Sequence, residues 1–507
     1  MAMTFLQALR LNARRFPKKS AVVFEGRTQS YAVFLDRVER MMTVLHGLGI
    51  EPGDKVAVIS ENHPDFLAAY VAVTGIGAIP APVNYLLSPE IMAEVVRRAN
   101  SVAVLLGEVA LEHAGHFRND VRHLLALGGD AGGSGLPCLS DLVEKTAPNP
   151  PQGRDGTTIM LHTSGTTGNP KGVLRSLYGM EERAIEQRFR PDDRALCALP
   201  ICLSAGCTYT LLPLYLGATV YLMRRFDGAG ALRLIEAERL TATMLLPAML
   251  QRITEAEGFD TADLSSMRTL QSGAGEIYPD LKIRMLEKFG DALNIYAASS
   301  EAGPYANLTA TDLRGNLAGN CVGRPFFGVE LKILDDDGNE VPQGEVGEIC
   351  TRSESRYDGY YKDEAQTAET RRGDYLTVGD LGRIDEEGFL WFTGRKRDII
   401  KSGGVNVYAP EIEEVLCTHS SIAEAHCIGL PDPRWTEAIC AVIVLAPGSA
   451  LVAQEVIAHA ETRLDRYKRP RRVVFMEAVP RNLTGRVLKA DLKESVLARL
   501  ANEEEIQ

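Results

Sequence analysis

The 507-residue sequence has no uninterrupted apolar run of about 18 residues, the length that a membrane-spanning helix needs. It also lacks the pattern of a disulfide-bonded secreted protein, because its nine cysteines are an odd number spread from Cys138 to Cys440. Cys197, Cys202 and Cys207 follow one another at a spacing that matches no common zinc site. We therefore expect buried, reduced cysteines and a cytoplasmic protein without a membrane span.

A surplus of positive charge is absent as well. The sequence carries 55 Lys and Arg against 67 Asp and Glu, a formal net charge of −12. This balance argues against nucleic acid as a partner. Hydrophobic residues make up 45% of the chain, which is ordinary for a globular protein, and the length suggests about three or four folding units. The oligomeric state stays open, and a homodimer is one state to test.

Short apolar runs alternate with helical patterns in the first part of the chain. Residues 55–60 and 102–106 are typical of buried strands, and residues 66–74 and 89–98 have helical spacing of apolar side chains. Strands that alternate with helices predict an α/β fold of stacked layers that contains parallel sheet.

The strongest local motif is Thr-Ser-Gly-Thr-Thr-Gly-Asn-Pro-Lys-Gly at residues 163–172, which follows an apolar strand pattern. Three glycines allow a tight approach of the backbone to a ligand, and hydroxyls, amides and Lys171 can surround an anion. The motif is not a Walker A loop, because Pro170 precedes the lysine and Gly172 follows it. We interpret it as a different triphosphate-binding loop.

Three further motifs follow in order. They are Ser299-Ser-Glu301, residues 375–380 (Tyr-Leu-Thr-Val-Gly-Asp), and residues 394–404, which continue through Asn406 and Pro410. Together with residues 163–172 they resemble the motifs of the adenylate-forming superfamily of acyl-CoA synthetases, peptide-synthetase adenylation domains and luciferases. The resemblance extends from Arg15 to Lys489.

The resemblance implies a two-step reaction with ATP, Mg²⁺ and CoA as cofactors. A carboxylate attacks the α-phosphate of ATP to give acyl-AMP and pyrophosphate, and a thiol then displaces AMP. It also implies a large N-terminal domain of stacked αβ layers, residues 1–396, and a small α+β domain, residues 397–507. The small domain would rotate between the two steps about a hinge at Arg397.

The family motifs also imply roles for single residues. Glu301 would bind Mg²⁺, Asp380 would accept hydrogen bonds from the ribose with Arg395 nearby, and Lys171 would hold phosphate. The expected ATP and AMP site comprises Thr163, Ser164, Gly165, Thr166, Thr167, Gly168, Lys171, Gly273, Ala274, Gly275, Tyr296, Ala297, Ser300, Asp380, Arg395 and Arg486.

Several positions depart from the family pattern. Arg486 stands where the family has a catalytic lysine, so adenylation could be slow or assisted by Lys489. Cys202-Leu203 replaces an aromatic-His pair, which predicts a more apolar acyl entrance. Ala297 stands where an aromatic ring usually packs on adenine, and Tyr296 would substitute only if the strand shifts by one residue. Ser300 keeps the hydroxyl of the usual threonine.

Residues 401–411 resemble the acyl-CoA synthetase version of their motif. The expected CoA contacts are Ser402, Gly403, Gly404, Trp435 and Arg471, the last within a run of six basic residues between 463 and 472. Trp435 could equally serve domain packing, and the basic run could be a solvated face.

An apolar acyl pocket is expected at Leu203, Met244, Ala297 and Ala298, which favours aryl or medium-chain acids. We therefore interpret the chain as an acid–thiol ligase, an AMP-forming acyl-CoA synthetase. Two alternatives remain open: an acyl-AMP ligase that loads a carrier protein, and a catalytically impaired binder of ATP or acyl-AMP.

Overall fold

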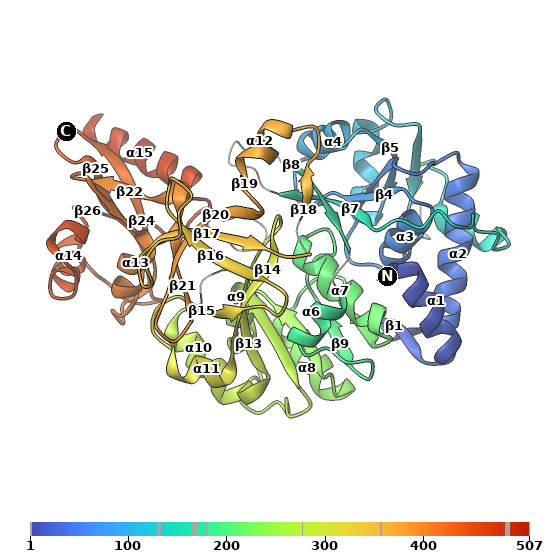
Figure 1. Ribbon diagram of the computed structural model, residues 1–507, viewed down its shortest axis with the longest axis horizontal. Coiled ribbons are helices and arrows are strands. Elements are labelled where there is room, and N and C mark those ends of the chain that lie inside the picture. Colours follow the sequence, from blue (N-terminus) through green and yellow to red (C-terminus); the bar gives the residue numbers. More distant parts are fainter. Residues whose placement is uncertain are drawn as a thin grey trace.

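The computed structural model describes residues 3–128, 133–163, 171–177, 180–275, 277–354, 357–481 and 487–505. Figure 1 shows a large body that begins at the N-terminus and a smaller unit beside it that carries the C-terminus. Among these described helices, none is both long enough and apolar enough to cross a membrane.

A fourteen-stranded sheet runs through the large body. Its parallel half has the order β1-β10-β9-β11-β12-β13, and the antiparallel half continues as β14-β15-β21-β20-β17-β16. The parallel strands are β1 (Ser20–Phe24), β10 (Thr219–Leu222), β9 (Arg194–Cys197), β11 (Ala242–Leu245), β12 (Thr269–Gly273) and β13 (Leu293–Ser299). The antiparallel strands are β14 (Gly303–Thr309), β15 (Cys321–Pro325), β21 (Leu390–Arg395), β20 (Tyr375–Ile384), β17 (Gly347–Arg352) and β16 (Glu330–Leu334), with β2 (Arg27–Ser30) and β19 (Arg371–Arg372) on edges.

Two smaller sheets complete the body. One is wholly parallel and consists of β4 (Ile79–Pro82), β3 (Lys55–Ile59), β5 (Ser101–Leu106) and β6 (His123–Ala126). The other is antiparallel and consists of β18 (Tyr357–Tyr360), β8 (Lys171–Ser176) and β7 (Thr158–Thr163). The predicted strands at 55–60 and 102–106 correspond to β3 and β5, so the α/β prediction is confirmed.

Helices cover the sheets and fill the spaces between them (Figure 1). All twelve residues of α3 (Pro64–Gly75) are buried, which fits a helix that is apolar on every side. The other helices of the body are α1 (Phe5–Arg15), α2 (Tyr31–Gly47), α4 (Pro89–Arg98), α5 (Leu139–Lys145), α6 (Met180–Glu186), α7 (Ser204–Leu216), α8 (Gly228–Glu238), α9 (Pro247–Thr254), α10 (Pro279–Phe289), α11 (Ala310–Gly315) and α12 (Glu364–Glu369), with 3₁₀ turns η1 (Glu108–His116) and η2 (Gly290–Ala292).

The smaller unit has its own five-stranded sheet and its own apolar clusters. Its strands are β22 (Ile400–Ser402), β23 (Val405–Val407), β24 (Ile422–Asp432), β25 (Thr436–Leu445) and β26 (Arg472–Phe475). Its helices are α13 (Ala409–Cys417), α14 (Ala453–Glu461), α15 (Lys489–Glu505) and the 3₁₀ turn η4 (Arg466–Lys468). The 3₁₀ turn η3 (Lys396–Asp398) links β21 of the body to β22.

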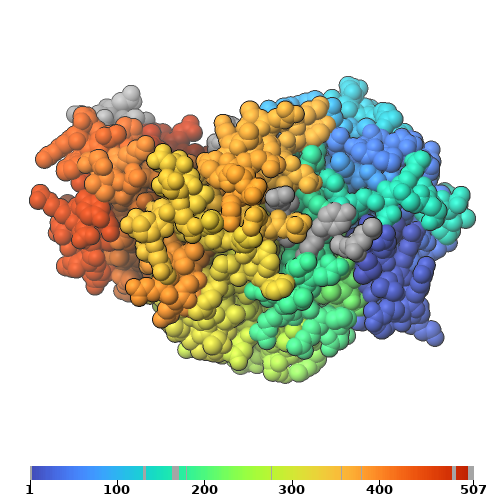
Figure 2. Space-filling model, in the orientation of Figure 1, coloured from blue at the N-terminus to red at the C-terminus, as the bar shows by residue number. Residues whose placement is uncertain are grey.

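The small unit lies against the part of the body that is coloured yellow in Figure 2. The Gly319 N–H donates to Glu414 Oε1 at 2.5 Å, a contact between the β15 side of the body and α13. Each unit therefore has a separate core, and few hydrogen bonds join the two.

All nine cysteines lie within the described residues, and no disulfide joins any two of them. Eight of them are buried, and Cys417 is half-buried. Burial raises the pKa of Cys197 and of Cys202 to about 12. The expectation of buried cysteines is confirmed for eight of the nine.

Candidate active site

The predicted phosphate loop connects two strands of one hairpin. β7 and β8 are antiparallel neighbours, and Thr163 pairs with Lys171 across the ladder. Lys171 therefore begins a strand and not a helix, in agreement with the interpretation drawn from Pro170. The predicted site residues that lie outside the described residues are Ser164, Gly165, Thr166, Thr167, Gly168 and Arg486.

Lys171 and Glu301 both contact Tyr360, and Lys171 also contacts Gln366, two side chains that the sequence analysis missed. The Lys171 ammonium donates to Gln366 Oε1 at 2.5 Å and lies 5.9 Å from the centre of the Tyr360 ring. The Tyr360 hydroxyl donates to Glu301 Oε1 at 2.8 Å. Burial and the nearby Glu301 charge raise the pKa of Tyr360. The pairing of β18 with β8 identifies Tyr360 as a neighbour of Lys171, and α12 supplies Gln366.

Glu301 lies in the turn between β13 and β14, directly after Ser300. The Ser299 hydroxyl shapes this turn by accepting the Ala302 N–H at 2.8 Å. Within the described residues, no group of three or more His, Cys, Asp or Glu side chains is arranged to hold a metal. This fits Mg²⁺, which is commonly held by one or two carboxylates together with substrate phosphates and water.

Asp380 is fixed from two sides. It is opposite Arg395 in the β20–β21 ladder, and Arg395 Nε lies 3.0 Å from Asp380 Oδ1. Tyr305, on β14, donates its hydroxyl to Asp380 Oδ2 at 3.1 Å. Asp380 is only 3% exposed, and burial together with the Asp380 charge raises the pKa of Tyr305 far above its usual range. The pair predicted from the motifs is therefore in contact, and Tyr305 is a third member that the sequence analysis missed.

The segment Gly273–Gly275 ends β12 at the carboxyl edge of the parallel strands, where α/β sheets commonly bind ligands. A Cβ on Gly273 would lie 2.3 Å from the Tyr296 carbonyl oxygen, so glycine is required there. Ala274 has a left-handed backbone with φ of 64°. The turn is thus a strained stretch of backbone.

The suggestion that Tyr296 replaces the missing aromatic ring beside adenine requires correction. Tyr296 is buried in the main core, and its ring lies 5.7 Å from that of Tyr209. Side chains alternate along a strand, so the next residue, Ala297, faces the opposite side and packs in the cluster of Tyr305. Tyr305 is therefore an aromatic side chain on the Ala297 side of the sheet.

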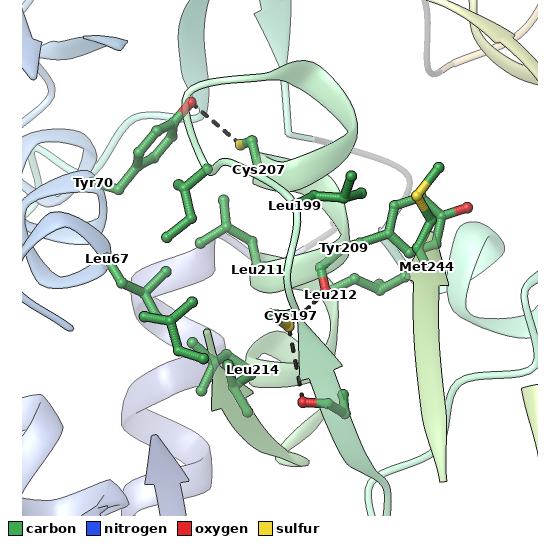
Figure 3. Packing of buried hydrophobic residues seen from close by; sticks show 14 of the residues in the cluster. Leu67, Tyr70, Cys197, Leu199, Cys207, Tyr209, Leu211, Leu212, Leu214 and Met244 are labelled. Carbon is green, nitrogen blue, oxygen red and sulfur yellow. Dashed lines mark hydrogen bonds between the residues drawn. The ribbon is translucent and has the colours of Figure 1, made fainter. Parts of the chain in front are cut away.

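Three of the four predicted acyl-pocket residues belong to the main apolar cluster. Met244 is buried, and Leu203 and Ala298 are half-buried against the same cluster, whereas Ala297 is not part of it. Figure 3 shows Met244 beside Tyr209, with Leu199 and the residues of α7 nearby. Leu203 directly precedes α7. Met244, Leu203 and Ala298 thus share the main apolar cluster, whereas Ala297 packs in the cluster of Tyr305.

The predicted CoA residues meet within the small unit. The Arg471 guanidinium lies 4.0 Å from the centre of the Trp435 ring. Gly403 packs on the same ring, and a Cβ added to Gly403 would lie 2.8 Å from the Cε3 atom of Trp435. Gly404 has open space around it. Ser402 Oγ and Arg471 Nη1 are buried and have no hydrogen-bond partner in the part of the chain that the structure describes. Gly403 thus has a packing reason to be glycine, while two polar atoms nearby are unsatisfied.

Lys489 occupies the interior of the small unit. Its ammonium donates to Glu413 Oε1 at 2.8 Å and to the Cys427 carbonyl at 3.1 Å. Burial alone would lower the pKa of Lys489, but the Glu413 carboxylate outweighs it and the pKa is raised. This placement does not support a role for Lys489 in assisting Arg486.

The basic run is partly neutralised. Lys468 pairs with Glu411 at 2.6 Å, and Arg469 donates to the carbonyls of Leu464 and Glu461. The predicted hinge residue Arg397 lies in η3, with its side chain about half exposed and Nε 3.6 Å from Asp398.

Comparison with known proteins assigns the family. Residues 9–361 match the model of the AMP-binding enzyme family, and residues 411–486 match that of the AMP-binding enzyme C-terminal domain. The chain is 33% identical to an indoleacetate–CoA ligase of Aromatoleum aromaticum over 95% of this chain and 96% of that protein. It is 32% identical to a feruloyl-CoA synthase of an Amycolatopsis species, with 95% and 96% covered.

A solved structure agrees with this assignment. The amide bond synthetase McbA from Marinactinospora thermotolerans superimposes with a TM-score of 0.88 at 29% identity, covering 97% of this chain and 99% of that one. The chain therefore belongs to the AMP-binding enzyme family, within the adenylate-forming superfamily, and is an enzyme of the AMP-forming ligase type.

Proposed function

We propose that this protein is an AMP-forming acyl-CoA synthetase that converts an apolar acid, aryl or medium-chain, to its CoA thioester. The observation that carries the proposal is the contact of Lys171 with Tyr360 and of Tyr360 with Glu301. These contacts join the phosphate-loop hairpin to the expected Mg²⁺ carboxylate. Asp380, held by Arg395 and Tyr305, supplies the expected ribose acceptor.

Each group has a role that follows from its chemistry. Lys171 and the loop amides would offset charge on the β- and γ-phosphates, and Glu301 is the carboxylate that would hold Mg²⁺. When bound, the ion would supply positive charge that stabilises the departing pyrophosphate. Asp380 orients the nucleotide by accepting hydrogen bonds from its ribose. The hinge at Arg397 separates domains of residues 1–396 and 397–507. It lets the small unit rotate relative to the large domain between the two steps.

The choice of an apolar acid rests on Met244, Leu203 and Ala298, which share one apolar cluster. The two relatives named for aromatic acids, indoleacetate and ferulate, favour the aryl class. CoA as the thiol is supported by Ser402 Oγ and Arg471 Nη1, two buried polar atoms without partners beside Trp435. A thioester-forming conformation would give these atoms hydrogen-bond partners on the pantetheine or phosphate groups.

The test is incubation with ATP, Mg²⁺ and a panel of indoleacetate, ferulate, octanoate, acetate and an amino acid. We expect acid-dependent pyrophosphate exchange with the aryl or medium-chain acids, and formation of AMP and acyl-CoA once CoA is added. Release of ADP would overturn the assignment. Product formation with a holo-carrier protein or an amine, while CoA is inert, would support a different acceptor. Exchange with no acid would support a binder that does not adenylate.

A further inference from the structure

Arg175 is a buried arginine that the proposed function does not yet use. It lies on β8, four residues after Lys171, opposite Tyr357 in the β8–β18 ladder. Only 3% of the residue is exposed, and its Nη2 has no hydrogen-bond partner among the residues that the structure describes. Within the same residues, Arg175 forms no ion pair. Burial lowers the pKa of Arg175 and outweighs the opposing effects of Cys207 and of the Glu301 charge.

Two other arginines each form an ion pair with a buried carboxylate. Arg268 is bound to Asp193, and Arg37 is bound to Asp65, with both of those carboxylates almost fully buried. An unpaired buried charge is costly, so it is rarely retained without a compensating group. Arg183, on α6, is also buried, and burial is the larger cause that lowers its pKa. The charge of nearby Arg175 lowers the pKa of Arg183 further. Two buried guanidinium groups therefore lie near one another in this part of the interior.

The surroundings of Arg175 indicate which anion. On one side, the N–H of its ladder partner Tyr357 donates to the Glu301 carbonyl at 2.8 Å, and the Glu301 charge acts on Arg175. On the other side, Cys207 is close enough to interact with Arg175 electrostatically. Cys207 lies one helical turn after Leu203 and is hydrogen-bonded to Tyr70 (Figure 3). Arg175 thus has the expected Mg²⁺ residue next to its ladder partner, and Cys207 of α7, which follows the expected acyl entrance, within electrostatic range.

We propose that Arg175 binds the carboxylate of the acid substrate. The inference rests on the proposed function, in which this carboxylate must meet the α-phosphate between those two features. A guanidinium fork matches the two oxygens of a carboxylate and can hold both. One of these oxygens then attacks the α-phosphorus, forming the acyl–phosphate bond. The bond from the α-phosphorus to the bridging oxygen breaks, and pyrophosphate leaves with the electron pair. Arg175 transfers no proton in this step.

The test compares Arg175→Met with the wild type in pyrophosphate exchange, using the acid that the wild type turns over best. We expect the KM for the acid to rise about ten- to hundredfold, as for loss of a hydrogen bond to a charged group, with the KM for ATP within about twofold. Calorimetry of acid binding with a non-hydrolysable ATP analogue and Mg²⁺ should show the same loss of affinity. The Tm should stay equal or rise, because the variant removes a buried, unpaired charge.

Arg268→Met is the matched control. It removes an arginine that is paired with buried Asp193, so its Tm should fall while the KM for the acid stays unchanged. If Arg175→Met does not fold, Arg175→Lys replaces it, since lysine keeps the charge but loses the fork. That variant should also raise the KM for the acid selectively.

Three outcomes would overturn the assignment while the proposed function stands. They are an unchanged KM and affinity for the acid, a rise in the KM for ATP alone, and a fall in Tm with both KM values unchanged. Absence of exchange by the wild type with every acid would instead overturn the proposed function, and the Arg175 assignment with it.

Discussion

The Glu301 carboxylate is held at the turn after β13, with one oxygen on the Tyr360 hydroxyl. Glu301→Gln should lower the adenylation rate about 100-fold or more, which corresponds to about 2.7 kcal/mol, because an amide is a weaker ligand for Mg²⁺ than a carboxylate. Tyr360→Phe keeps the carboxylate and loses one hydrogen bond to it, so we expect a smaller loss of about tenfold. Pyrophosphate exchange measures both rates. Full activity in a folded Glu301→Gln protein would show that Glu301 is not the magnesium residue.

Arg486 lies outside the described residues, so its prediction comes from the family resemblance alone. If arginine stands in for the catalytic lysine, Arg486→Lys should raise the adenylation rate, and Arg486→Ala should depress it. Formation of thioester from supplied acyl-AMP and CoA should change little in either variant. Only a group that contacts developing charge in one step alters the rate of that step.

The two half-reactions are measured separately, by pyrophosphate exchange and by CoA consumption. Slower adenylation in Arg486→Lys would mean that arginine is adapted to this site. Equal losses in both half-reactions would point to misfolding, and circular dichroism checks this directly.

At the scale of single elements, the first turn of α7 packs closely on the chain before it. A Cβ on Gly206 would lie 1.9 Å from the Pro200 carbonyl oxygen, a backbone atom that cannot turn aside. Gly206→Ala should therefore displace the turn that follows Leu203. We expect a loss of about 1–3 kcal/mol in stability and a higher KM for the acid, with the KM for ATP unchanged.

Thermal unfolding and exchange kinetics measure these two effects. Gly47→Ala is the matched control, because Gly47 ends α2 and a Cβ there meets no atom within 4 Å. Its Tm should not fall, since alanine favours a helix. An unchanged Tm and KM in Gly206→Ala would show that α7 adjusts without affecting the acyl entrance.

Elements with strong local patterns were predicted well from the sequence. β3 and β5 are short apolar runs, and α4 covers the predicted range 89–98. The error at Tyr296 has a physical cause: the side of a strand that faces the nucleotide depends on how β13 pairs with β12 and β14. A motif alignment supplies no such pairing. Tyr360 and Gln366 were missed for a similar reason, because β18 meets β8, and α12 brings Gln366 to Lys171, only in the tertiary structure.

At the scale of the whole molecule, the body and the small unit have separate cores and are joined through η3. Lys396 is held by Asp336 at 2.7 Å and by Glu348 at 3.2 Å, whereas the Arg397 side chain is 47% exposed. Trypsin should therefore cut first after Arg397, because exposed links between domains are the preferred sites of cleavage. MgATP with the acid substrate should change the rate of this cut if the small unit rotates there.

Mass spectrometry of the first fragments identifies the cleaved bond. The expected products end at residue 397 and begin at residue 398. A first cut within the body, with the link intact, would contradict a hinge at Arg397.

The stability of the body should depend on pH through His162. Burial lowers the pKa of His162 to about 4, an effect that exceeds the opposing bond of Nδ1 with the Pro82 carbonyl. The unfolded chain takes up this proton near its ordinary pKa of about 6.5, so protons favour the unfolded state between about pH 6.5 and 4. The Tm should therefore fall as the pH is lowered through this range.

The comparison is His162→Asn, which can keep the hydrogen bond to Pro82 and does not titrate. Thermal unfolding between pH 4 and 7.5 should show a shallower fall of Tm in the variant than in the wild type. Parallel curves would show that other groups account for the acid sensitivity.

The sequence by itself determined the α/β class, the order of the four motifs and the identity of the charged groups. Each of these depends on residues that are near neighbours along the chain, where local propensity and spacing are enough. Only the tertiary structure decided which side of β13 Tyr296 occupies, that Tyr305 and Tyr360 hold Asp380 and Glu301, and that Lys489 is tied to Glu413. It also placed Arg175 in the interior, where its Nη2 has no hydrogen-bond partner among the described residues. These properties arise from contacts between distant strands, and burial and charge pairing exist only after those strands have come together.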